Sequence, residues 1–279
     1  MKRIKPWLLL LVENCASFSS NSLMPGLLIL WLFSLILTFT GLGDLPLRDF
    51  DEATVARVSF ELSQKLGLEK LLPTIWGEPY LNKPPGLHWL IASFMNLGHE
   101  NFDSLALPSE FDIRFVPAFL STLVVPFGGL IQSRLRPNDH ISSFLTSGIL
   151  LTLLPLVRHG RLAMLDGTQL SIIAFLWLLL LNIDTSNDSK YYAFYAGISS
   201  SFLLLLKAPF LFPALMAGLI PFLRINDFKI IFIWKLFRFF SLGLFPGIIW
   251  HVWHALNRGE DALWLWSGDG AARVLFDAG

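Results

Sequence analysis

Seven charged side chains in this sequence are of the types that move protons and bind anions. Three are carboxylates and four are cations beside long apolar runs: Asp51, Glu52 and Asp166, then Lys83, Arg158, Arg161 and Lys207. A cation left unpaired in a bilayer costs about 2.5–3.5 kcal/mol on insertion scales, so it usually finds an anion or extends to the interface. A carboxylate that accepts a proton, beside a cation that neutralises a phosphate, suits group transfer from a lipid-linked phosphate.

Lys83 is the best placed of the four cations to bind a phosphate. In "YLNKPPG", Pro84 and Pro85 restrict the backbone directly after it, so its ammonium is held rigidly. The other three have a simpler alternative. Arg158 and Arg161 in "VRHGRLAMLDG" can anchor the chain at the interface, and Lys207 in "LLLLKAPF" can extend its ammonium there.

The carboxylates stand where helices are expected to begin. After Asp51 and Glu52, apolar residues recur at helical spacing, which predicts an amphipathic helix at the membrane interface: Val55, Val58, Leu62 and Leu66. Negative charge is favourable at a helix N-terminus, so capping is the alternative role for both residues and for Asp166, which heads a later apolar run. Of the adjacent pair, we expect Asp51 to be the reacting carboxylate.

Composition places the chain among membrane proteins, since 54% of its 279 residues are hydrophobic and 15% are charged. Lys plus Arg and Asp plus Glu both number 21, so no overall charge attracts nucleic acid. The single cysteine excludes an internal disulfide, and no nucleotide-binding fingerprint is present. Residues 1–22 are interpreted as an uncleaved cytoplasmic tail.

Seven apolar runs are expected to span the membrane, near residues 23–42, 114–133, 141–157, 168–183, 191–206, 208–223 and 230–250. The run 86–98 is about 20 Å long as a helix, against ~30 Å of hydrocarbon, so we expect it to lie in the interface or re-enter. The predicted fold is therefore an all-α membrane domain over residues 23–250, with juxtamembrane helices in a long first outer loop, 43–113.

The distribution of basic residues orients this domain. With the basic N-terminus inside, "RLRPNDH" also faces the cytoplasm, while the loop 43–113 and the segment 251–279 lie outside. The expectation is a multi-pass protein of the cell membrane whose site residues all meet on the non-cytoplasmic surface. The Trp-rich "WHVWHALNRGEDALWLW" is interpreted as an interfacial belt, with His251 and His254 as a weak alternative metal pair.

Five motifs resemble, in order, those of membrane glycosyltransferases that use polyprenyl-phosphate sugars. They are "FDEATVARVSFELSQ", "GEPYLNKPPGLHWLIA", "FDIRFVPAFLS", "RHGRLAMLDG" and "SFLLLLKAPFLFPAL", and the resemblance covers about residues 44–223. This group, which includes lipid A aminoarabinose transferases and protein O-mannosyltransferases, has the GT-C fold. The resemblance implies a GT-C-like helical bundle and inverting sugar transfer to a lipid, glycan or protein acceptor.

The resemblance also implies roles for single residues. Asp51 is the catalytic or acceptor-orienting carboxylate with Glu52 beside it, Lys83 holds the lipid phosphate, and Asp166 is the second carboxylate. Asn82 stands where some members have a metal-binding Glu, so a divalent metal has no support here. Family members continue with further spans and an outer domain, which implies that residues 1–279 are an N-terminal portion whose activity needs the missing spans.

Two other classes of protein remain as alternatives. A transporter or flippase-like protein would use Lys207 and Asp166 as buried gating charges near broken helices. That class predicts inverted repeats, which the sequence does not show, and a short first loop, whereas the loop 43–113 is long. A non-catalytic truncated homologue would bind lipid or a partner through the same residues.

Overall fold

The computed structural model describes residues 23–48, 50–98, 108–184, 188–225 and 230–259. The tail 1–22 and the segment 260–279 lie outside the described residues. Within the described ranges, the regular secondary structure is helical apart from one short β-hairpin, so the all-α prediction is confirmed. The first described helix is α2 Leu23–Phe39. The outer loop then contains α3 Asp51–Gln64, η2 Gly67–Leu71, β1 Thr74–Ile75, β2 Glu78–Pro79 and α4 Gly86–Gly98.

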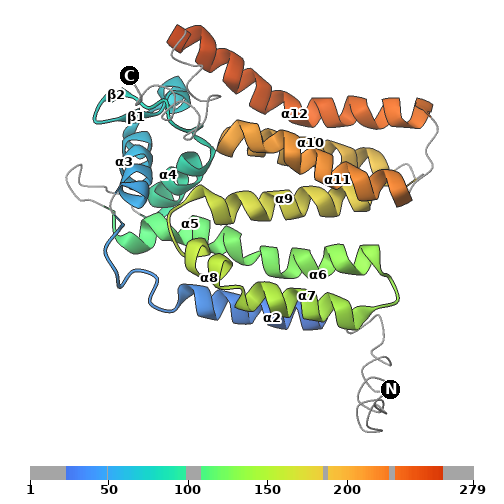
Figure 1. The fold of residues 1–279 in the computed structure, drawn as a ribbon. Coiled ribbons are helices and arrows are strands. Elements are labelled where there is room, and N and C mark those ends of the chain that lie inside the picture. Colours follow the sequence, from blue (N-terminus) through green and yellow to red (C-terminus); the bar gives the residue numbers. More distant parts are fainter. Residues whose placement is uncertain (1–22, 49, 99–107, 185–187, 226–229, 260–279) are drawn as a thin grey trace, which may run out of the picture.

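The remaining helices form most of the bundle. They are α5 Glu110–Thr122, α6 Val124–Leu135, α7 His140–Thr152, α8 Leu154–Gly160, α9 Leu165–Leu181, α10 Ser189–Lys207, η3 Ala208–Phe210, α11 Leu211–Ile225 and α12 Ile230–Arg258. In Figure 1 the long helices lie roughly side by side, with α2 and α7 at one edge, α6 and α9 in the middle, and α12 at the other edge. The helices α3 and α4 and the β-hairpin lie together at one end of this stack.

The seven predicted membrane spans all fall on helices, but not every one of these helices is long enough to cross a bilayer alone. Three stretches qualify by length and composition, Glu110–Leu135, Ser189–Pro221 and Leu236–Arg258, and α7 with α8 makes a fourth if the bent pair is one span. The predicted spans 191–206 and 208–223 lie within one helical stretch that η3 interrupts after Lys207. The helices α2 and α9 are apolar but have 17 residues each. The chain is thus a multi-pass helical membrane protein.

A proline explains the bend between α7 and α8, which is 56°. Pro155 lies in the first turn of α8 and has no N–H to donate to the last turn of α7, and Leu153 between the two helices is extended with ψ 106°. The predicted span 141–157 is therefore divided, and α8 carries Arg158 away from the axis of α7.

Small residues let α10 and α12 approach closely. A Cβ atom added at Gly197 would collide with the backbone carbonyl of Phe240, and one at Gly247 would lie 2.7 Å from the hydroxyl of Ser201. Gly243 and Gly247 form a G-x-x-x-G pair on α12 that faces Gly197 and Ser201 on α10. Small residues at this spacing are a common basis for helix packing in membranes, where backbone proximity replaces a hydrophobic driving force.

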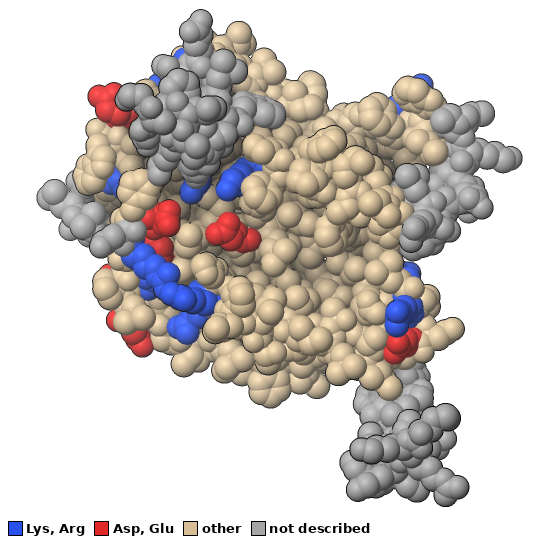
Figure 2. Space-filling model, in the orientation of Figure 1, with Lys and Arg blue, Asp and Glu red and all other residues tan. Residues whose placement is uncertain are grey.

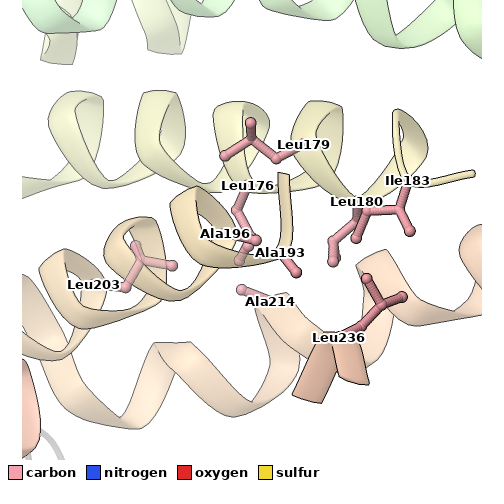
Figure 3. Packing of buried hydrophobic residues seen from close by; sticks show 9 residues of the cluster. All are labelled: Leu176, Leu179, Leu180, Ile183, Ala193, Ala196, Leu203, Ala214 and Leu236. Atoms are coloured by element: carbon pink, nitrogen blue, oxygen red, sulfur yellow. The ribbon is translucent and has the colours of Figure 1, made fainter. Parts of the chain in front are cut away.

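One apolar core lies among α9, α10, α11 and α12, and Figure 3 shows its side chains converging from these helices. Its buried members are Leu176, Leu179, Leu180, Ile183, Ala193, Ala196, Leu203, Ala214 and Leu236. The indole of Trp177 donates a hydrogen bond of 2.8 Å to the carbonyl of Ala214, which ties α9 to α11 beside this core.

A second core joins the outer loop to the bundle. It contains Val55 of α3, Leu87 and Ile91 of α4, Ile113 of α5 and Leu206 of α10, among others. The predicted amphipathic helix α3 is confirmed, but protein covers its apolar face, because Val58 and Leu62 pack with Ala92 of α4. Leu66 lies beyond the helix and is 80% exposed, so its assignment to that face is wrong. The helices α3 and α4 of the outer loop therefore pack on the bundle and can position side chains rigidly.

Candidate functional site

Charged side chains gather at one end of the molecule. In Figure 2 most Lys, Arg, Asp and Glu side chains on the visible face lie at the end formed by α3, α4 and the start of α5, with a smaller group at the opposite end. Between the two groups, the surface consists of other residues, as expected for a bilayer-spanning region.

The structure brings Asp51 and Lys83 to one cavity of about 310 Å³, between the start of α3 and the segment before α4. The Asp51 side chain is exposed in the first turn of α3. Polar and aromatic groups complete the lining, which consists of Phe50, Asp51, Thr54, Val55, Tyr80, Asn82 and Lys83. We call this space the acid–lysine cavity. It combines a proton acceptor, a cation and polar side chains that can contact a sugar.

The backbone that leads to Asp51 is strained. Phe50 precedes α3 with φ 67° and ψ −65°, a region that non-glycine residues rarely adopt. Phe50 is the N-terminal flanking residue and its side chain makes no capping hydrogen bond, while Asp51 and Glu52 both lie in the first turn of the helix. A strained residue next to a carboxylate that lines a cavity is typical of a functional site.

Glu52 points away from that cavity and is fully buried. Arg114 of α5 binds it through two parallel hydrogen bonds, Nε to Oε1 at 2.9 Å and Nη2 to Oε2 at 2.8 Å. The backbone N–H of Ala163 donates to Oε1 at 2.7 Å, and that of Arg48 donates to Oε2 at 2.9 Å. We call this arrangement the Glu52–Arg114 clasp. Both carboxylate oxygens of Glu52 are thus occupied by hydrogen bonds, whereas the side chain of Asp51 is exposed.

The clasp also fixes the chain between α2 and α3. Arg114 Nη1 donates to the carbonyls of Leu42 and Leu45 at 3.0 and 2.7 Å, and its Nη2 donates to that of Pro46 at 2.9 Å. Burial alone would raise the pKa of the Glu52 carboxyl, but the hydrogen bonds from Arg114, Ala163 and Arg48 outweigh it and lower the pKa below its ordinary value. Glu52 is therefore ionised and paired at neutral pH.

A buried histidine supports one wall of the acid–lysine cavity. The His88 ring, on α4, meets the ring of Tyr80 edge to face with centroids 5.4 Å apart. Burial, together with the nearby charge of Lys83, lowers the pKa of His88 to about 3, so the ring is neutral at physiological pH. A neutral His88 adds no second positive charge behind Lys83.

Arg158 and Arg161 do not line the acid–lysine cavity. They belong to a second cavity of about 430 Å³, which we call the arginine pocket, with Gly41, Leu42, Leu45, Pro46, Arg48, Arg114 and Leu162. Arg161 donates through Nη2 to the carbonyl of Thr40 at the end of α2. The structure thus divides the predicted phosphate ligands between two cavities, Lys83 in one and the two arginines in the other.

Asp166 and Lys207 lie at the same end of the bundle but line neither cavity. Asp166 is exposed in the first turn of α9, whose flanking residue Met164 makes no side-chain cap, so Asp166 is not the predicted N-cap. Ala163, three residues earlier, binds Glu52 and so brings this turn close to the clasp. Lys207 ends α10, and its Nζ lies 4.9 Å from the centroid of the Phe210 ring.

The end of α10 supports the segment that carries Lys83. A Cβ atom added at Gly86 would lie 2.7 Å from the carbonyl oxygen of Leu205, so the start of α4 packs directly on the α10 backbone. This contact places Lys207 beside the Lys-Pro-Pro-Gly segment without making it part of the cavity.

The described residues contain no group of three or more His, Cys, Asp or Glu side chains that could hold a metal ion. Of the pair singled out in the sequence, a ring nitrogen of His251 lies 3.1 Å from the carbonyl of Leu204, and His254 stacks on Trp250 with centroids 4.9 Å apart. Both rings are buried. Trp250 is buried as well and donates to the carbonyl of Leu71 at 2.9 Å, so this residue of the predicted belt packs on the outer loop.

Sequence reasoning missed Arg48, Arg114 and Tyr80. A signal was present for Arg114, because an arginine beside the second predicted span requires a partner. Nothing in the spacing identified Glu52 as that partner.

A model of one protein family matches this chain. Its description is dolichyl-phosphate-mannose-protein mannosyltransferase, and it matches residues 83–261, well over half of the chain. The matched region includes Lys83, Arg114, Asp166 and Lys207, while Asp51 precedes it. No curated protein matches the chain significantly.

Proposed function

The chain belongs to the dolichyl-phosphate-mannose-protein mannosyltransferase family, and on that premise we propose that it transfers a sugar from a polyprenyl-phosphate donor to a lipid, glycan or protein acceptor. The family has the GT-C fold, so the resemblance found in the sequence is confirmed at this level. By its name, the family uses mannose carried on dolichyl phosphate and a protein acceptor, which makes mannose the first donor sugar to test. We place the reaction on the non-cytoplasmic face, following the predicted orientation.

In the proposed reaction, a hydroxyl oxygen of the acceptor attacks the anomeric carbon of the sugar. Asp51 accepts the hydroxyl proton as the new carbon–oxygen bond forms, because it is the exposed carboxylate of the acid–lysine cavity. The bond between that carbon and the phosphate oxygen breaks, and the electron pair leaves with the polyprenyl phosphate. A single displacement of this kind inverts the anomeric configuration.

Lys83 is proposed to neutralise the departing phosphate. The negative charge on this group grows as the bond breaks, so a fixed ammonium stabilises the transition state more than the ground state. Pro84 and Pro85, both buried, hold Lys83 in place, and Gly86 packs on the α10 backbone behind them. Asp166 and Lys207 are proposed to act beside this cavity, Asp166 as a second carboxylate for the acceptor and Lys207 toward the donor.

The observation that carries this proposal is the convergence of Asp51 and Lys83 in one cavity, next to a clasp that fixes the chain around Asp51. The test uses the purified full chain in nanodiscs with radiolabelled polyprenyl-phosphate mannose and a panel of protein and lipid acceptors. Release of free mannose to water serves as a readout that needs no acceptor.

Asp51→Asn is expected to lower the transfer rate about 10²- to 10⁴-fold while the protein inserts and melts as the wild type does. Glu69→Gln is the matched control, since Glu69 is an exposed carboxylate of the same outer loop that lines neither cavity. Lys83→Gln should weaken donor use, whereas Lys190→Gln, at the start of α10, should not. Activity retained in Asp51→Asn would refute the assignment of the reacting carboxylate.

A further inference from the structure

The arginine pocket contains four arginines, and only one of them, Arg114, is paired with a carboxylate among the described residues. Its lining comes from the chain after α2, from α5, and from the end of α8 with the following loop. Among the described residues, this lining includes four arginines and no carboxylate. We infer that this pocket binds a phosphate group, at a site separate from the acid–lysine cavity. The inference does not depend on the proposed sugar transfer.

The hydrogen bonds show which of the four charges are available. Arg114 is paired with Glu52 and also donates to three carbonyls, so its charge and donors are committed. Arg161 gives one donor to the carbonyl of Thr40 and makes no ion pair with a described residue, although the Asp44 carboxylate lies near it beside Gly41. In the part of the chain that the structure describes, the side chains of Arg48 and Arg158 make no hydrogen bond or ion pair. Three positive charges therefore face one pocket without an ion-paired carboxylate among the described residues.

The chemistry of these groups favours phosphate. The guanidinium fork matches two phosphate oxygens at once, and it is the usual side chain for binding phosphate esters. Apolar residues make up much of the remaining lining, notably Leu42, Leu45 and Leu162. Such walls lower the local dielectric constant and strengthen the attraction between the arginines and an anion.

The dimensions favour a phosphate with a group attached. A volume of about 430 Å³ lies within the range of small-molecule sites, roughly 300–1,000 Å³, and exceeds what a bare phosphate fills. A phospholipid headgroup and free phosphate share the chemistry that the arginines recognise, and binding experiments can distinguish them.

The pocket is built into the same scaffold as the acid–lysine cavity. The backbone N–H of Arg48 donates to Glu52, and three residues later Asp51 lines the other cavity. Arg48 lines the arginine pocket and Asp51 lines the acid–lysine cavity, and Lys83 lines only the second of them. Binding in the arginine pocket should therefore be insensitive to Lys83.

The test measures binding to the purified full chain in an uncharged maltoside detergent. The probes are radiolabelled inorganic phosphate and, separately, dihexanoyl phosphatidic acid. Arg48→Gln combined with Arg158→Gln is expected to weaken binding of at least one probe tenfold or more. Arg134→Gln with Arg136→Gln removes the same charge from exposed residues at the other end of α6, and should change binding less than twofold.

Each outcome bears on the inference. Loss of binding for both probes identifies a general phosphate site, and loss for the lipid alone identifies a headgroup site. No saturable binding to the wild type, or equal losses in the two double variants, would overturn the inference. An equally large loss in Lys83→Gln would overturn the separation from the acid–lysine cavity. If the double variant fails to fold, Arg158→Gln alone serves, since Arg158 is exposed and without a described partner.

Discussion

The Glu52–Arg114 clasp and the acid–lysine cavity both include a carboxylate from the first turn of α3, but the two carboxylates are in opposite environments. Glu52 is fully buried and accepts four hydrogen bonds, two from Arg114 and two from backbone N–H groups. Asp51 is exposed and lines a cavity. Adjacent residues on a helix point about 100° apart, which is enough to place one in the core and one in a site.

This difference in environment implies different roles for the two carboxylates. A carboxylate whose lone pairs are all occupied cannot accept a proton without breaking its bonds, so Glu52 is unsuited to act as a base. An exposed carboxylate in a polar cavity can accept a proton without breaking such bonds. Mutations in the clasp should therefore change stability first, and mutations in the cavity should change activity first.

The largest expected effect on stability comes from breaking the clasp on one side. Arg114→Met leaves the buried Glu52 charge without its partner, which typically costs about 3–5 kcal/mol. Thermal unfolding of the full chain in detergent measures the loss. Asp51→Asn should stay within about 0.5 kcal/mol of the wild type, since it changes an exposed side chain.

A double variant then sharpens the comparison. Glu52→Gln in the Arg114→Met background removes the unpaired charge and should recover part of the stability. If Arg114→Met unfolds at the same temperature as Asp51→Asn, the clasp does not hold the loop in place.

The next effect is a loss of stability in acid. Because the folded-state pKa of Glu52 lies below its ordinary value of 4.5, its contribution to the free energy of unfolding is complete above that pH. The contribution is lost as the pH falls through the lower folded-state value. We expect a smaller loss than in Arg114→Met, since protonation leaves some hydrogen bonds intact.

Glu61 contributes in the same pH window. Burial alone would raise its pKa, but hydrogen bonds from Thr74, Gly77, Arg57 and Trp76 lower it overall. Melting temperatures of wild type, Glu52→Gln and Glu61→Gln between neutral pH and pH 3 separate the two contributions. The wild type and Glu52→Gln should converge in acid, and parallel curves would show that Glu52 takes no part.

The sequence predicts the parts of the structure that depend on local pattern. Apolar runs identify the helices of the bundle, and the spacing of Val55, Val58 and Leu62 identifies α3. The two prolines after Lys83 lie in a non-helical segment directly before α4, which begins at Gly86. These features need only the residues themselves and their immediate neighbours.

Features that depend on long-range approach could not be predicted. Glu52 pairs with Arg114, and Arg48 shares a pocket with Arg158, because distant segments meet in the folded bundle. Without an alignment or a structure, either acidic residue of the pair could be the partner of Arg114. The predicted span 230–250 falls within α12, which continues to Arg258.

A moderate effect is expected behind the acid–lysine cavity. The Cβ of Gly86→Ala would lie 2.7 Å from the backbone oxygen of Leu205, and a backbone atom cannot move aside as a flexible side chain does. Overpacking of this kind typically costs about 1–3 kcal/mol. The shift should also move the segment that carries Lys83, so donor use should fall together with the melting temperature.

Gly148→Ala is the matched control, because Gly148 lies within α7 and has no neighbour within 4 Å of the added Cβ. It should be neutral or stabilise the helix by up to about 1 kcal/mol. A Gly86→Ala variant as stable as Gly148→Ala would mean that α4 does not rest on α10 as described.

The smallest effect is expected where α12 braces the outer loop. At 29 residues, α12 is roughly 44 Å long, more than ~30 Å of hydrocarbon requires, and Trp250 in its later part reaches Leu71. Trp250→Phe removes that hydrogen bond but keeps an aromatic ring near Trp89, so the cost should be about 0.5–1.5 kcal/mol. Trp234→Phe, on the exposed face of the same helix, should cost less.

Because Trp250 contacts the outer loop at Leu71, its loss should accelerate proteolysis of that loop without unfolding the bundle. Equal proteolysis of both tryptophan variants would show that α12 does not support the loop.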